Sequence, residues 1–172
     1  RFQGNLFGEL TLIKGLTFRS AWGFDKSNSE NLSYNPTYKY GTFTQTVSQL
    51  FQNDANSFYW VWDNILSYKK VISELHNIDL TVGHTAEKET GRFTTLRATN
   101  VPPERNLWYI SLGDPNVTFV PNRTGGNLLQ RKSIFARANY SFKDRYNLGA
   151  VLRRDGSSAF PVNQKSGTFY SV

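Results

Sequence analysis

The sequence predicts an all-β fold in which antiparallel strands form a sector of a large transmembrane outer-membrane β-barrel with long extracellular loops. Polar and apolar residues alternate with a period of two in several stretches. These stretches are about 10 to 12 residues long, enough to cross a bilayer at a tilt. Short and long connections alternate strictly along the chain. Outer-membrane barrels show this alternation, whereas a soluble sandwich has no physical reason for it.

Three hairpins are expected, near residues 5–25, 58–87 and 131–155. The first turns at Lys14–Gly15, the second around 69–75 and the third at 143–145, and each is short. Six strands are fewer than the roughly eight of the smallest known barrels. The segment is therefore expected to be part of a larger barrel, and residues 167–172 read as the start of another strand.

Long loops are expected near 26–57 and 88–130, because both stretches are rich in Asn, Ser, Thr, Tyr or Pro. Gly125–Gly126 follows no strand-to-helix pattern, so it is expected to lie in a loop and not to cradle a phosphate.

Aromatic residues at the predicted strand ends suit the interfacial girdles of a membrane barrel, and a soluble β core is the alternative. They are Trp22, Phe24, Tyr59, Trp60, Tyr68, Tyr140 and Tyr146. Ala138 and Leu148 are expected to face lipid, so replacing either with Arg should abolish assembly.

Composition excludes several classes of protein. The 172 residues contain no Cys, which removes a disulfide scaffold, a thiolate zinc site and a Cys nucleophile. The net charge of +7 comes from Lys and Arg scattered along the chain, so a nucleic-acid partner is not expected. The sequence contains no run of about 20 apolar residues, so it does not predict a transmembrane helix. The chain begins at Arg1 and contains no Met, so it reads as a mature or excised piece.

Catalytic and metal sites are not expected. His76 and His84 are eight residues apart on one predicted strand, about 26 Å, which is too far to share a metal. Neither Asp63 with Asp79 nor Glu87 with Glu89 has the spacing that identifies an acid/base pair. The sequence therefore indicates neither an enzyme nor a protein with a cofactor.

The most individual string is Arg153-Arg154-Asp155-Gly156-Ser157-Ser158, which ends the third hairpin. Taken alone, it indicates an ordered strand exit, with Arg–Asp pairing and a turn or bulge at Gly156. With the preceding Ser133–Tyr146 stretch, it closely resembles a barrel signature of SusC/RagA-type TonB-linked outer-membrane proteins. Three more segments resemble that family: Ile13–Arg19, Trp62–Tyr68 and His76–Gly83.

The resemblance implies an outer-membrane active importer that takes up oligosaccharides or peptides. It also implies a SusD-like lipoprotein lid, and TonB coupling through a TonB box and plug that are not among these residues. Polar residues of the strands and the exit motif would line the lumen and hold the plug or a solute; the candidates are Arg19, Arg137, Asn139, Arg153, Arg154, Asp155 and Gly156. Trp108 and Tyr109 would contact the solute or the lid, or else pack the loop itself.

Two other classes remain open from the sequence. One is a soluble all-β carbohydrate-binding or cell-surface adhesion module. The other is a fragment of a glycan-active enzyme, which would need a carboxylate pair that the sequence does not reveal.

Overall fold

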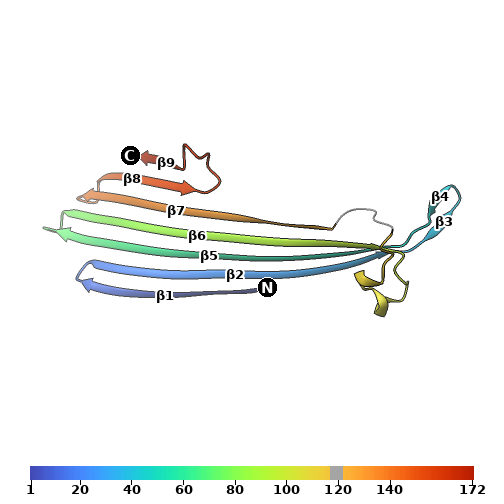
Figure 1. Cartoon of the computed structure of the whole chain (residues 1–172). Helices are drawn as coiled ribbons and strands as arrows, with labels where there is room; N and C mark the ends of the chain where they lie inside the picture. Colours follow the sequence, from blue (N-terminus) through green and yellow to red (C-terminus); the bar gives the residue numbers. More distant parts are fainter. Residues whose placement is uncertain (117–121) are drawn as a thin grey trace. The chain divides into compact units, whose positions relative to one another are not determined.

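The computed structural model describes residues 1–116 and 122–172 (Figure 1). Seven antiparallel strands form one sheet in the order β1-β2-β5-β6-β7-β8-β9, and β3 and β4 form a separate two-stranded sheet. The large sheet comprises β1 (Phe2–Ile13), β2 (Leu16–Asn35), β5 (Gln49–Ile72), β6 (His76–Thr99), β7 (Arg123–Phe142), β8 (Tyr146–Ser157) and β9 (Ser166–Ser171). The all-β antiparallel prediction is confirmed, and β9 lies where the sequence predicted another strand to begin.

The chain divides into two compact units, which are described separately. The sheet unit contains residues 2–25, 58–90 and 128–172. The loop unit contains residues 26–57 and 91–127 together with Arg1. Strands β2, β5, β6 and β7 contribute residues to both units.

Three short turns lie at one end of the sheet unit (Figure 1). Gly15 has a φ of 86°, Ser73 and Glu74 have φ of 52° and 55°, and Lys143 and Asp144 both have φ of 53°. Two central residues with positive φ are typical of the two-residue turns that match the twist of β-hairpins. Neighbouring turns are also joined, since the Lys143 amide donates to the Leu75 carbonyl at 2.8 Å.

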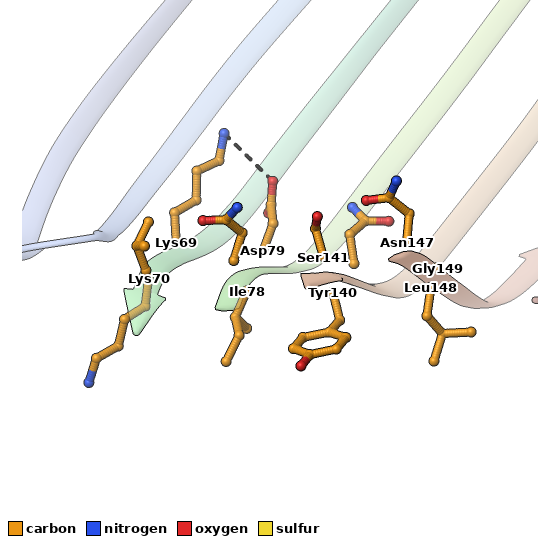
Figure 2. Close-up of a pocket in the computed structure, with 12 residues that line it drawn as sticks. Lys69, Lys70, Ile78, Asp79, Tyr140, Ser141, Asn147, Leu148 and Gly149 are labelled. Atoms are coloured by element: carbon orange, nitrogen blue, oxygen red, sulfur yellow. Dashed lines mark ion pairs between the residues drawn. The ribbon is translucent and has the colours of Figure 1, made fainter. Parts of the chain in front are cut away.

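The residues of the sheet unit sort onto two faces by the parity of their numbers. In the β7–β8 register, Ala138 pairs with Ala150 and Tyr140 with Leu148, whereas Ser141 pairs with Asn147. Figure 2 shows Ile78, Tyr140 and Leu148 on one side of the sheet and Asp79, Ser141 and Asn147 on the other. We call the even-numbered side the apolar face and the odd-numbered side the polar face.

Among the described residues, the buried apolar side chains belong to the loop unit. Leu50 is fully buried, Val101 is 3% exposed, and Ser48 donates to the Val101 carbonyl at 3.0 Å. This unit also holds the small hairpin of β3 (Tyr38–Tyr40) and β4 (Phe43–Gln45) and two 3₁₀ helices, η1 (Arg105–Leu107) and η2 (Ile110–Leu112). No helix of the described residues is long and apolar enough to cross a membrane.

The strands run further than the sequence predicted. The expected loops near 26–57 and 88–130 contain the ends of β2 and β6 and the beginnings of β5 and β7. These extensions are rich in Asn, Ser and Thr on both faces, so their alternation has no hydrophobic contrast to detect. Residues 117–121 of the second expected loop lie outside the described residues.

Gly125 and Gly126 are likewise in strand β7 and not in a loop, so that expectation was wrong. Their lack of a side chain allows close approach by neighbouring residues. A Cβ on Gly125 would come within 2.7 Å of the Phe93 ring, and one on Gly126 would meet the Gly91 carbonyl oxygen.

Candidate functional site

The polar face of the sheet unit carries every Asp and Glu of that unit's strand segments. They are Glu9, Asp25, Asp63, Asp79, Glu87, Glu89 and Asp155, all at odd positions. Several basic and hydroxyl side chains share this face, so it presents donors and acceptors together. Such a surface suits a water-filled interior that contacts polar groups.

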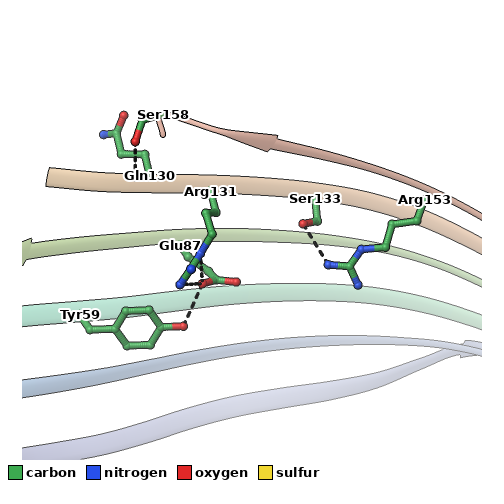
Figure 3. Close-up of polar contacts among 7 residues, drawn as sticks. All are labelled: Tyr59, Glu87, Gln130, Arg131, Ser133, Arg153 and Ser158. Carbon is green, nitrogen blue, oxygen red and sulfur yellow. Dashed lines mark hydrogen bonds and ion pairs between the residues drawn. The ribbon is translucent and has the colours of Figure 1, made fainter. Parts of the chain in front are cut away.

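A hydrogen-bonded triad crosses three strands of this face (Figure 3). Glu87 on β6 accepts a hydrogen bond from the Tyr59 hydroxyl on β5 at 3.2 Å. The same carboxylate pairs with Arg131 on β7, at 3.0 Å from Nε and 2.9 Å from the terminal nitrogen. The Glu87 side chain is only 23% exposed, which limits solvent screening of the pair. The triad therefore fixes β5, β6 and β7 to one another through side chains as well as backbone.

A second cluster lies at Arg153, where the sequence placed its exit motif. Arg153 on β8 donates from Nε to both Asp155 oxygens, at 2.7 and 2.9 Å. Its terminal nitrogen donates to Ser133 on β7 at 3.3 Å, and Ser133 is 7% exposed (Figure 3). The motif thus ties the end of β8 to β7.

Further polar contacts continue the network toward the short turns. Thr85 donates to Asp63 at 2.6 Å, and Lys69 lies 3.6 Å from Asp79 in an ion pair (Figure 2). Asn77 donates to Asp144 of the neighbouring turn at 2.8 Å. The hollow drawn in Figure 2 is lined partly by these residues.

The apolar face carries large side chains that are exposed in the described structure. Leu10 is 60% exposed, Leu148 61% and Leu152 53%, with Trp22 and Leu80 also exposed. A soluble protein rarely exposes a contiguous apolar surface of this kind. Facing lipid is the physical situation in which such a surface is stable.

One polar cluster lies on the apolar face, and its side chains form hydrogen bonds with one another. The Trp62 indole donates to the Ser20 hydroxyl at 3.0 Å, and Ser20 donates to the side-chain amide oxygen of Asn64 at 2.8 Å. Polar groups facing hydrocarbon are costly unless they are hydrogen-bonded. The sequence reasoning missed this trio, although all three residues share even parity.

The lumen candidates divide between the two faces. Arg137, Asn139, Arg153 and Asp155 lie on the polar face, where Arg137 Nε donates to Asn139 at 3.3 Å. Arg154 lies on the apolar face, with Ile134 and Thr168 as its register partners. Gly156 pairs with Lys132 and Ser166 and has no side chain to place.

Arg19 also lies on the polar face, with its guanidinium 4.8 Å from the centre of the Phe7 ring. Among the aromatic residues expected in girdles, Tyr59 is on this polar face, as its bond to Glu87 shows, whereas the others are at even positions. Sequence reasoning could have found the triad, because Tyr59, Glu87 and Arg131 share odd parity.

The two loop candidates differ in their surroundings. Trp108 stacks on Tyr34 with ring centres 5.0 Å apart and an interplanar angle of 19°, and its indole donates to the Pro103 carbonyl at 3.2 Å. Its ring thus packs within the loop unit. Tyr109 is 60% exposed and leaves its ring accessible.

The described residues contain no group of three or more His, Asp or Glu side chains that could hold a metal. His76 Nδ1 lies 2.7 Å from the Tyr140 hydroxyl, and the His84 ring contacts Trp62 edge-on. The two histidines thus contact different aromatic neighbours on the apolar face, and His76 also contacts Phe142.

A sheet of long antiparallel strands, with one exposed apolar face and one hydrogen-bonded polar face, defines a sector of an outer-membrane β-barrel. Comparison with known proteins supports this class. No protein-family model matches the chain. Three TonB-dependent receptors of Formosa agariphila match it: P39 is 26% identical over all of this chain, and P3 and P26 are 28% and 29% identical over 99% of it. The chain spans only 16% to 17% of their lengths.

Solved structures give the same result. A structure of the RagAB peptide transporter matches 98% of this chain with a TM-score of 0.87 and 23% identity. The RagAB peptide importer in the "open-open" state matches 98% with a TM-score of 0.85 and 25% identity. This chain covers 18% of each of those chains. The chain thus matches a segment of TonB-dependent receptors in sequence and a sector of the RagAB transporter in structure, and TonB-dependent receptors are outer-membrane proteins.

Proposed function

We propose that the chain forms part of the barrel of an active importer that takes up oligosaccharides or peptides with a SusD-like surface lipoprotein. The observation that carries this proposal is the polar face, on which linked donors and acceptors extend from the short turns to the exit motif. In the proposed orientation, this face lines the lumen and the apolar face contacts lipid.

The chemistry of the polar face suits a solute that offers hydrogen-bonding groups. Arg137 and Asn139 point from β7 to the same side as Arg153 and Asp155 on β8. Both charge signs are present, so the face can contact amide, carboxylate or hydroxyl groups. Peptides are favoured by the matched RagAB structures, which are described as a peptide transporter and importer.

We propose that the solute or the lid lipoprotein contacts residues of the loop unit. Tyr109 is our candidate contact, because its ring is exposed and Trp108 already stacks on Tyr34. An exposed tyrosine ring stacks on sugar faces or peptide groups while its hydroxyl hydrogen-bonds. The plug and TonB box would belong to other parts of the full receptor, which we propose to be energised through the TonB complex.

The experiment is uptake by cells that carry the full receptor. Labelled peptide and oligosaccharide mixtures are supplied to cells with the receptor gene intact, deleted or restored. Receptor-dependent accumulation that a protonophore abolishes supports TonB-coupled import. Accumulation that is unchanged by deletion of the receptor gene contradicts the proposal.

The soluble-module alternative is disfavoured by the apolar face, which would expose many large side chains to water. An enzymatic role finds no support either, because the matched receptors and transporters belong to a class that is typically not enzymatic.

A further inference from the structure

The charged residues of the apolar face are all basic. In the strand segments of the sheet unit, the charged even-numbered positions are Lys70, Lys88, Lys132 and Arg154. Every Asp and Glu of those segments lies on the opposite face. A random surface would mix both signs, so this segregation requires a physical reason.

Three of these cations lie together at the end of the apolar band that is distant from the short turns. On β6, β7 and β8, mostly apolar residues extend from the short turns, with His76 and His84 among them on β6, and then Lys88, Lys132 and Arg154 follow on the same face. The three strands are consecutive neighbours in the sheet. Neighbouring strands are about 4.8 Å apart, so the three cations fall within the width of a few lipid headgroups.

The contacts on the polar face establish this proximity. Glu87 pairs with Arg131 across β6 and β7. The next residues, Lys88 and Lys132, therefore project from the same stretch of the two strands but on the apolar face. Arg154 lies opposite Ile134, two residues from Lys132, so it is diagonal to that lysine. We call Lys88, Lys132 and Arg154 the basic row.

The basic row has no carboxylate partner in the parts of the chain that the structure describes. Arg154 donates only to the Ser166 hydroxyl, at 3.0 and 3.3 Å. Lys132 and Arg154 are exposed, and Lys88 is half-buried. Unpaired cations at the edge of an apolar band need anions from outside the sheet.

The depth of Arg154 fits the polar boundary of a bilayer. Arg154 follows Tyr146, the first residue of β8, by eight positions, about 26 Å along the strand. With a strand tilt of about 35 to 45°, this brings Arg154 to about 20 Å above the turn, near the upper edge of a band about 25 Å tall. Long basic side chains at that level reach the headgroups by extending along the surface.

We propose that Lys88, Lys132 and Arg154 bind the phosphate groups of an anionic glycolipid in the leaflet distant from the short turns. Several cations on a rigid sheet match a multiply charged headgroup, and Arg154 adds directional donors that suit phosphate oxygens. The site is on the lipid side of the sheet and is separate from the lumen. It requires only that the apolar face contacts lipid, whatever the transported solute is.

The test uses the full receptor, purified and placed in phosphatidylcholine nanodiscs that contain lipid A as the probe. Lipid retained by each receptor is counted by native mass spectrometry. The variant K88Q/K132Q/R154Q is compared with K14Q/K70Q/K143Q, which removes the same charge near the short turns. We expect the first variant to lose lipid A retention at least about fivefold, the factor that a single cation contributes beside an anionic leaflet. The control variant should keep it.

Two further arms identify the source of the anion. Lipid A with its phosphates removed should be retained no better by the unaltered receptor than by the first variant, and millimolar inorganic phosphate should not displace intact lipid A. Equal retention by all receptors, equal loss in both variants, or full retention of the dephosphorylated lipid overturns the proposal.

Assembly is checked by heat-modifiable mobility. If K88Q/K132Q/R154Q fails to assemble, K88R/K132R/R154K keeps the charge and should keep both assembly and retention. Loss of retention in this charge-conserving variant, if it is assembled, would also overturn the proposal. Solute uptake is measured in parallel, so that failure of lipid binding is distinguished from failure of the importer function.

Discussion

The Tyr59–Glu87–Arg131 triad shows how one side chain stabilises a sheet at several points. Glu87 is the shared acceptor for a hydroxyl on one side and a guanidinium on the other. Removing a shared, half-buried acceptor leaves two donors without a partner, which costs more than the loss of one exposed ion pair. The Lys69–Asp79 pair, with Lys69 72% exposed, is the natural comparison.

We predict that Glu87→Ala lowers the free energy of unfolding of the full receptor by about 1 to 3 kcal/mol, because Tyr59 and Arg131 both lose their acceptor. Lys69→Ala should lower it by no more than about 1 kcal/mol, because that pair is exposed and screened. Unfolding in urea, followed by tryptophan fluorescence in detergent, measures both. Equal effects of the two substitutions would show that the triad contributes no more than a surface pair.

Position 83 requires glycine because the Phe135 ring on the next strand occupies the space that a Cβ would need. A Cβ at Gly83 would meet the Phe135 ring, whereas one at Gly8 would meet nothing within 4 Å. We predict that Gly83→Ala displaces Phe135 and costs about 1 to 3 kcal/mol, the usual range for overpacking. Gly8→Ala serves as the neutral control.

The measurement for this pair is again urea unfolding, with a second variant as the decisive comparison. In a Phe135→Leu background, the cost of Gly83→Ala should shrink, because the ring is gone. A cost that persists unchanged in that background would point to the backbone and not to the ring.

At the scale of the element, each strand of the sheet unit presents lipid and lumen surfaces at alternate residues. On β7, Ala138 lies on the apolar face and Ser141 on the polar face. We predict that Ala138→Arg prevents assembly, because an Arg facing the middle of the membrane costs about 2 to 4 kcal/mol. The sequence alone predicts the same outcome for Leu148→Arg, but Leu148 lies only two residues after the start of β8, close to a short turn, so its effect on assembly should be smaller.

Ser141→Arg is the matched control on the same strand, and it should assemble because its side chain faces the polar side. Heat-modifiable mobility of outer-membrane extracts reports assembly of each variant. Normal assembly of Ala138→Arg together with failure of Ser141→Arg would reverse the assignment of the two faces.

The strand positions and their short turns could be predicted from sequence where one face is apolar. Leu148, Ala150 and Leu152 against Asn147 and Arg153 give a clear period of two, and the structure has β8 there. The ends of β2, β5, β6 and β7 could not be found this way. Ser27, Asn28, Ser29 and Glu30 alternate polar with polar, so only the pairing with neighbouring strands reveals them.

The candidate site was predictable in part for the same reason. Arg153 and Asp155 have odd parity, and the structure links them to each other on the polar face. Arg154 follows immediately and must project to the other side of the sheet. Treating the motif as one unit does not predict this difference between the two arginines. The stacking of Trp108 on Tyr34 joins residues 74 positions apart and has no local signal.

At the scale of the whole molecule, the sheet has two edge strands. In this sheet, β1 has only β2 as a hydrogen-bonded neighbour, and β9 has only β8. Within a bilayer, each unpaired backbone group costs several kcal/mol, so an open edge is unstable there. We propose that both edges pair with further strands in a full receptor.

We predict that residues 1–172, expressed alone and refolded in detergent or lipid, give no monomeric heat-modifiable species, whereas the full receptor does. The physical reason is closure: seven strands fall below the smallest barrels, of about eight strands, and exposed edges pair with other copies instead. Gel mobility with and without heating, together with size-exclusion chromatography, measures this. An isolated chain that inserted as a protease-resistant monomer would show that its edges are satisfied within the chain. A discrete oligomer would show instead that copies of this sector close one barrel together.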